Sequence, residues 1–60
     1  MEKIFKKLLY QYGYTYKYYK AKSGQYIVKI FNGEEEYDSI IGLDLDKIML
    51  ILIKRIKNEN

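Results

Sequence analysis

The sequence predicts a small α+β domain, in which a three-stranded antiparallel meander has both helices packed on one face. Apolar residues recur with helical spacing near both ends of the chain. Between them, apolar and polar residues alternate as they do in half-buried strands, and glycines mark two hairpin turns. The expected order of elements is α-β-β-β-α, in a single domain over residues 1–60.

The first helix is expected over residues 2 to about 12, because five apolar side chains fall on one stripe at about 100° per residue. The stripe consists of Ile4, Phe5, Leu8, Leu9 and Tyr12. Gly13 is a natural stop, since glycine tolerates the left-handed conformation after a helix end. The opposite side of the helix carries Lys3, Lys6, Lys7 and Tyr10.

Three strands are expected at residues 14–21, 25–31 and 34 to about 40. Lys22-Ser23-Gly24 supplies the first turn. Asn32-Gly33 supplies the second, which we expect to be type I′ because both residues accept positive φ. The alternation gives the first two strands a shared outward face, which carries Thr15, Lys17, Tyr19, Ile27, Lys29 and Phe31.

A second helix is expected from Asp44, a good N-cap, to about Lys57. Leu50 and Ile51 lie off its apolar stripe, on the side that should be polar. They are either part of a protein interface or two stray exposed side chains, and in so small a chain we favour the interface. The core is expected to contain Ile4, Phe5, Leu8, Tyr26, Val28, Ile30, Leu45, Ile48, Met49, Leu52 and Ile56.

The composition argues against catalysis. A domain of 60 residues has a marginal core, which small proteins usually reinforce with disulfides, a metal or oligomerisation. The chain has no cysteine and no histidine, so it lacks the strongest nucleophile and the commonest general base, and it has no glycine-rich phosphate loop. We expect a protein that is not an enzyme, uses no cofactor or metal, and binds itself or a partner.

The first functional hypothesis is a protein-interaction module. Tyrosine suits interfaces because its ring is apolar and its tip polar. Lys, Ile, Tyr and Asn, whose codons are AT-rich, supply 30 of the 60 residues, which suggests a phage- or mobile-element-encoded inhibitor or adaptor that occludes a host protein. In a homodimer the lysines beside Leu50 and Ile51 would repel their copies, so an interface with a foreign partner remains an alternative to the homodimer. The expected interface residues are Leu50, Ile51, Lys47, Lys54, Tyr19, Ile27 and Phe31.

The second hypothesis is nucleic-acid binding. The α-β-β-β-α order is similar to that of the double-stranded RNA-binding domain, over the whole chain but only as an order of elements. The resemblance implies a second helix with a basic N-terminus, whereas the matching positions hold Asp44 and Asp46 with Lys47, and carboxylates repel phosphate. The candidate nucleic-acid contacts are Lys3, Lys6, Lys7, Tyr10, Lys17 and Lys29.

The net charge of +3 is segregated along the chain, with +6 in residues 1–32, −6 in 33–46 and +3 in 47–60. Such a pattern either orients a partner or is neutralised within the fold. The longest apolar run, residues 48–53, is far shorter than the roughly 20 residues that span a membrane. Lys6 and Lys7 interrupt the N-terminal apolar segment, so we expect no signal peptide, a cytoplasmic location and no membrane partner.

Overall fold

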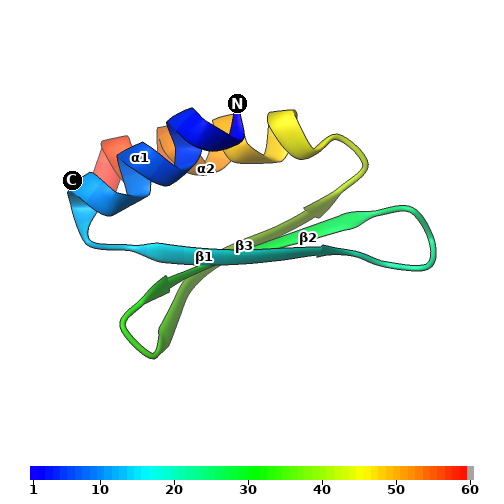
Figure 1. The fold of residues 1–60 in the computed structure, drawn as a ribbon, viewed down its shortest axis with the longest axis horizontal. Coiled ribbons are helices and arrows are strands. Elements are labelled where there is room, and N and C mark those ends of the chain that lie inside the picture. Colours follow the sequence, from blue (N-terminus) through cyan, green and yellow to red (C-terminus); the bar gives the residue numbers. More distant parts are fainter. Residues whose placement is uncertain (60) are drawn as a thin grey trace.

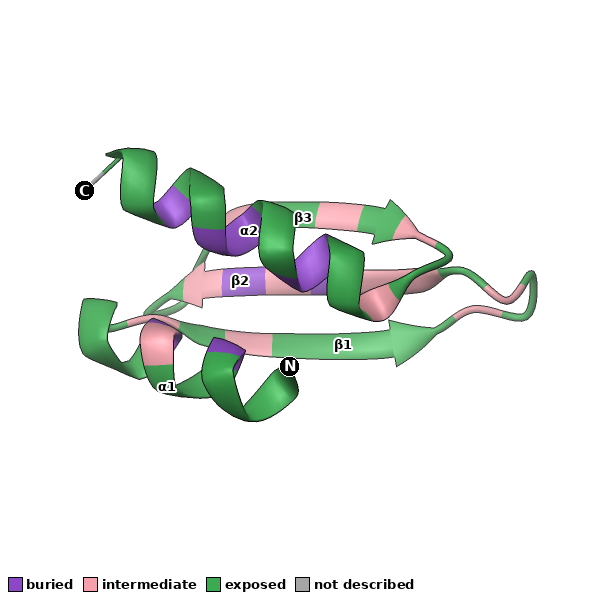
Figure 2. Cartoon of the chain, turned by 90° about the horizontal axis from the view of Figure 1, so that it is seen from above, coloured by how far each residue is buried: buried purple, intermediate pink, exposed green. Residues whose placement is uncertain are grey.

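The computed structural model describes residues 1–59 and has the predicted order of elements. The elements are α1 (Glu2–Tyr12), β1 (Thr15–Lys20), β2 (Tyr26–Asn32), β3 (Glu35–Gly42) and α2 (Leu45–Glu59). The strands form an antiparallel sheet in the order β1-β2-β3, and both helices lie on the same side of it (Figure 1). Seen from above, α1 runs along β1 and α2 crosses β2 and β3 (Figure 2). The predicted α+β class and the three-stranded meander are confirmed.

The core lies between the two helices and the sheet. Phe5 and Leu9 come from α1, and Val28 and Ile30 come from the central strand β2. The largest contribution is that of α2, with Ile48, Met49, Leu52, Ile53 and Ile56. Since Val28 and Ile30 are fully buried, the predicted phase of β2 is confirmed, and the intervening residues must face away from the helices.

One expected core residue is not buried, because Ile4 is 64% exposed. α1 contacts the core through Phe5 and Leu9, which lie one turn apart, and Ile4 is about 100° round the helix from Phe5. Ile53, which was not expected in the core, is buried on the flank of α2. The prediction for Ile4 was wrong because α1 lies over an edge strand, where it buries only part of its apolar side. Leu8, Tyr26 and Leu45 are partly buried against the core.

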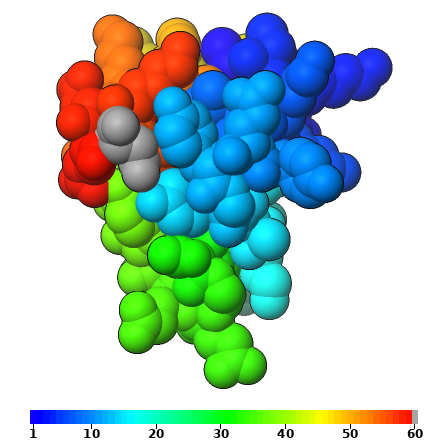
Figure 3. All heavy atoms as spheres, turned by 90° about the vertical axis from the view of Figure 1, so that its left-hand side faces the viewer, coloured from blue at the N-terminus to red at the C-terminus, as the bar shows by residue number. Residues whose placement is uncertain are grey.

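The β2–β3 turn also differs from the prediction. Gly33 has a φ of 68°, and every residue with a positive φ among residues 1–59 is a glycine. Asn32 pairs with Glu35, so the turn consists of Gly33 and Glu34, with positive φ at its first position as in a type II′ turn. The expected type I′ turn is excluded, because it requires a positive φ at both central residues and Glu34 does not have one. A bulge also shifts the register of the β2–β3 pairing between Ile30 and Phe31. The tip of this hairpin projects away from the helices (Figure 3).

The predicted cap at the start of α2 and the predicted stop of α1 are both confirmed. The backbone N–H of Lys47 donates a hydrogen bond of 3.1 Å to the side chain of Asp44, which caps α2. Gly13 closes α1 with a φ of 80°, and the N–H of Tyr14 bonds back to the carbonyl of Leu9 at 2.9 Å. This reversal places β1 directly beneath α1. Within residues 1–59, neither helix combines the length and the apolar character needed to cross a membrane.

The same substitution should lower the free energy of unfolding by different amounts on the two faces of β2. We expect Ile30→Ala to lower the free energy of unfolding by about 2–5 kcal/mol, because it leaves a cavity in the core. Ile27→Ala, on the uncovered face, should cost about 1 kcal/mol or less, the span of β-propensity. Urea titrations followed by circular dichroism measure both values. Equal costs would contradict the one-sided core; if Ile30→Ala does not fold, Ile30→Val should still cost about 0.5–1.5 kcal/mol.

Candidate functional site

The face of the sheet that the helices leave uncovered is the main candidate surface, and we call it the open face. Its residues come from alternate positions of the three strands. The register places them in three rows across the sheet, which are Thr15–Phe31–Glu36, Lys17–Lys29–Ser39 and Tyr19–Ile27–Ile41. The structure therefore brings together all six residues that were expected to face outward from the first two strands.

One row of the open face is apolar. Tyr19, Ile27 and Ile41 lie directly opposite one another on the three strands, and Ile41 is 60% exposed. Opposite side chains have Cβ atoms about 4.5–5.5 Å apart, so the row is a continuous strip. Sequence reasoning missed Ile41 because the third strand was expected to end near residue 40. Gly42 was the available signal, since it marks the break two residues later.

The middle row is basic, and its charges are partly satisfied within the protein. Lys17 lies opposite Lys29, an arrangement that is destabilising unless other groups relieve it. The Lys29 Nζ lies 3.7 Å from a carboxylate oxygen of Glu36, and the Lys17 Nζ lies 5.9 Å from the centroid of the Phe31 ring. These three charged side chains leave a net charge of +1, so the centre of the open face favours an anionic group.

The apolar row continues round the edge of the sheet at β3. Ile41, Leu43 and Ile51 line a shallow hollow of about 300 Å³, which Lys47 borders. Leu43 is 73% exposed and adds the most accessible apolar side chain of this region. We call Ile41, Leu43, Lys47 and Ile51 the β3 corner. It joins the open face to the second helix.

The four α2 residues expected at an interface are all exposed and lie on one side of the helix, and the β3 corner includes two of them. Leu50 and Ile51 are both exposed, as expected, but they lie about 100° apart on the helix. Lys47 and Lys54 project between them. Ile51 and Lys47 belong to the β3 corner, whereas Leu50 and Lys54 do not line it.

The expected nucleic-acid contacts are divided between two surfaces. Lys17 and Lys29 lie on the open face, whereas the residues of α1 belong to the helical layer. Lys6 connects the two, because it lines an open hollow of about 550 Å³ together with Lys17 and tyrosines of β1. Tyr10 borders a neighbouring hollow of about 290 Å³, which Lys6 also lines. The remaining contacts expected from α1 are Lys3 and Lys7, which line neither of these two hollows.

Two tyrosines of β1 hold the start of α1 to the sheet. The hydroxyls of Tyr16 and Tyr18 donate hydrogen bonds of 2.8 and 3.0 Å to the two carboxylate oxygens of Glu2. The bond from Tyr16, followed by that from Tyr18, holds the pKa of Glu2 below its ordinary value. Burial and the bond to Glu2 raise the pKa of Tyr16 to about 12. At neutral pH the contact therefore joins an ionised carboxylate to two neutral phenols.

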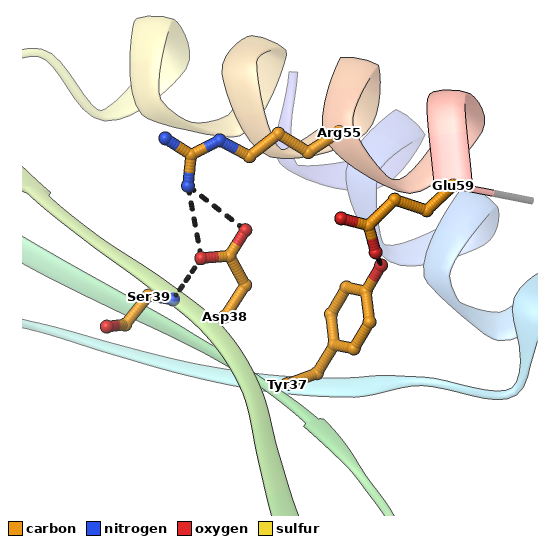
Figure 4. Close-up of polar contacts among 5 residues, drawn as sticks. All are labelled: Tyr37, Asp38, Ser39, Arg55 and Glu59. Atoms are coloured by element: carbon orange, nitrogen blue, oxygen red, sulfur yellow. Dashed lines mark hydrogen bonds and ion pairs between the residues drawn. The ribbon is translucent and has the colours of Figure 1, made fainter.

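A second set of polar contacts joins β3 to α2 (Figure 4). Arg55 donates to both carboxylate oxygens of Asp38 at 3.1 Å. The hydroxyl of Tyr37 donates to Glu59, which raises the pKa of Tyr37, and its ring stacks on that of Tyr14 at 4.8 Å. Part of the acidic segment is therefore neutralised within the fold.

The comparisons with protein-family models, with curated proteins and with solved structures gave no match. Among residues 1–59, no three His, Cys, Asp or Glu side chains are grouped in a way that could hold a metal ion. The candidate site is therefore defined by the geometry of the chain itself, as the open face and the β3 corner.

The raised pKa of Tyr16 predicts a loss of stability at alkaline pH. The folded state favours the neutral phenol, so this contribution is complete below the ordinary pKa of 10 and is lost as the pH rises toward about 12. Tyr16→Phe cannot ionise there. We expect the melting temperature of the wild type to fall more steeply than that of the variant between pH 10 and 12, as measured by circular dichroism. Parallel curves would contradict the assignment.

Proposed function

We propose that this chain is a non-enzymatic protein-binding module, whose open face and β3 corner bind the surface of another protein. The observation that carries the proposal is the apolar row Tyr19–Ile27–Ile41, which continues into Leu43 and Ile51 at the corner. A module of this size acts by covering a working surface of its partner, as an inhibitor or adaptor does. The lack of histidine and cysteine supports a role without catalysis.

The magnitudes indicate what the partner must supply. Complete burial of an apolar side chain contributes about 1.5–3 kcal/mol, and association costs roughly 4–15 kcal/mol. The apolar side chains of this surface are 41–73% exposed, and they are Tyr19, Ile41, Leu43 and Ile51. Binding can therefore bury only about half of each side chain, and it gains about half of that free energy. The apolar contacts therefore reach only the low end of the cost. The partner must also make polar contacts.

The charges favour a foreign partner over a second copy. Lys29 is the middle residue of the central strand, and Lys17 lies opposite it. Two copies that met face to face about a central two-fold axis would bring these lysines against their own copies. Like charges in such a position cost several kcal/mol. A partner with carboxylates over Lys17 and Lys29, and an apolar group over Ile41, fits this surface better than a homodimer.

Single-stranded nucleic acid is a second candidate for the same face. The observation in its favour is the pair Lys17 and Lys29, flanked by the aromatic residues Tyr19 and Phe31. Two features weigh against it. The ammonium group of Lys17 lies over the Phe31 ring, and the two aromatic residues are four positions apart in register, or about 13 Å. That spacing is too wide for stacking two neighbouring bases.

Ile41→Lys tests the protein-binding proposal, with Ile4→Lys as its control. The two isoleucines are 60% and 64% exposed, but Ile4 lies on α1, away from the proposed site. Each immobilised chain is exposed to nuclease-treated lysate, and the retained proteins are identified by mass spectrometry. We expect a protein that the wild type and Ile4→Lys retain and that Ile41→Lys loses at least tenfold, a difference of about 1.4 kcal/mol.

Other outcomes separate the alternatives. Retention that is lost with Leu50→Lys but kept with Ile41→Lys would move the interface to the other flank of α2. A wild-type mass in sedimentation equilibrium that doubles with concentration, and is monomeric for Ile41→Lys, would identify a homodimer instead of a foreign partner. If no retained protein responds to either substitution, the proposed surface is not a binding site.

The nucleic-acid alternative predicts a salt dependence. If Lys17 and Lys29 each neutralise one phosphate, the slope of log K against log salt should fall by about 1.4 in Lys17→Gln/Lys29→Gln, or about 0.7 for each contact. Fluorescence anisotropy with a labelled oligothymidylate measures the slope. Lys54→Gln/Lys57→Gln carries the same change in charge and should behave as the wild type. No binding at low salt, or equal slopes in the two variants, would exclude this candidate.

A further inference from the structure

The outer side of β1 is an unpaired sheet edge, with α1 running along it in the helical layer (Figure 2). The order β1-β2-β3 pairs β1 with β2 on one side, and no other strand within residues 1–59 pairs with its second side. In an antiparallel sheet, alternate residues of an edge strand direct their N–H and C=O groups outward. Such an edge can accept a further strand, which is a common mode of peptide recognition.

Two hollows show that this edge is accessible. Tyr16, Lys17, Tyr18 and Tyr19 all line the hollow of about 550 Å³. Successive residues of a strand point to opposite faces, so four in a row can line one hollow only if it runs along the edge of the strand. The adjoining hollow of about 290 Å³ extends it, since its lining residues include 14–16. The accessible edge therefore follows most of β1.

The other edge of the sheet is better protected. The β2–β3 pairing contains a bulge, a feature by which sheets obstruct edge-to-edge pairing. Arg55 reaches from α2 to Asp38 in the middle of β3 (Figure 4). The pairing of β1 with β2 is regular from Thr15 to Lys20, and the strand contains no proline. β1 is thus the more regular of the two edge strands, although Lys17 and Lys20 restrict which strands it accepts.

The charges along this edge identify the kind of segment that it fits. Lys6 and Lys17 line the larger hollow, and Lys3 borders the neighbouring surface at the start of α1. The one carboxylate in this part of the structure, Glu2, already accepts hydrogen bonds from Tyr16 and Tyr18. The surroundings of the edge are therefore cationic and aromatic.

We propose that the outer edge of β1 accepts an acidic, extended segment of another protein as a fourth strand of the sheet. Backbone hydrogen bonds would hold the segment in register, and its carboxylates would meet Lys6 above the sheet and Lys17 below it. A second copy of β1 is a poor occupant, because it brings its own lysines to the same place. Nucleic acid has no backbone groups that continue a sheet ladder. The edge shares Lys17 and Tyr19 with the open face but has no residue in common with the β3 corner, so a substitution at the corner separates this proposal from the proposed function.

The test uses the full chain labelled with nitrogen-15 and the N-acetylated peptide Glu-Glu-Val-Val-Glu-Glu, which is as long as β1 and carries carboxylates on both faces of an extended strand. We expect saturable binding and slower hydrogen exchange at alternate amides of residues 15–20. The same peptide with all backbone amides N-methylated keeps its charge but cannot donate backbone hydrogen bonds to β1, so it should not bind. Lys6→Gln/Lys17→Gln should weaken binding about tenfold. The matched variant Lys54→Gln/Lys57→Gln and the variant Ile41→Lys should bind as the wild type does.

Several results would overturn the proposal. They are no saturation at millimolar peptide, equal binding of the N-methylated peptide, and protection of β3 amides in place of β1. Protection of the β1 amides by oligothymidylate, but not by the peptide, would make the edge a nucleic-acid site. Protection that grows with protein concentration alone, together with a rising mass, would show that another copy occupies the edge. Because Ile41→Lys leaves this edge intact, failure here is distinguishable from failure of the β3 corner.

Discussion

α1 and α2 bury their apolar sides against one face of a three-stranded sheet, and this single layer of packing organises the rest of the molecule. Phe5, Val28, Met49, Leu52 and Ile56 meet there with no exposed surface. Both helices of residues 1–59 lie on the same face of the sheet, and no element of this range covers the other face. The open face is thus a consequence of the placement of both helices on the same side of the sheet.

The tyrosines extend this small core to its margins. Tyr16 packs its ring edge-on against Phe5, at 5.1 Å between centroids, while its hydroxyl reaches Glu2 on α1. Tyr37 on β3 makes a similar pair of contacts, because its ring stacks on Tyr14 and its hydroxyl donates a hydrogen bond to Glu59 on α2. In each case the ring adds apolar contact and the hydroxyl joins strand to helix. These contacts explain much of the high tyrosine content without any binding role, and they leave Tyr19 as the tyrosine of β1 on the open face.

The distribution of charge gives the two sides of the sheet different characters. On the β3 side, the ion pairs of Asp38 with Arg55 and of Glu36 with Lys29 neutralise part of the acidic segment. On the β1 side, lysines of α1 and β1 surround an edge where Glu2 is already engaged. Lys17 belongs both to this edge and to the open face. A partner with carboxylates and apolar side chains could therefore contact both surfaces at once.

The sequence by itself determined the elements, the strand phases, the N-cap at Asp44 and the exposure of Leu50 and Ile51. These features depend on residues within a few positions of one another, so periodicity and capping rules predict them. The tertiary structure alone decided that Ile4 stays exposed, that the β2–β3 turn is not type I′, and that Ile51, but not Leu50, lines the hollow at the β3 corner. It also placed Ile41 in line with Ile27 and Tyr19. The physical reason is that cross-strand register and helix placement arise from contacts between distant residues, which local periodicity does not encode.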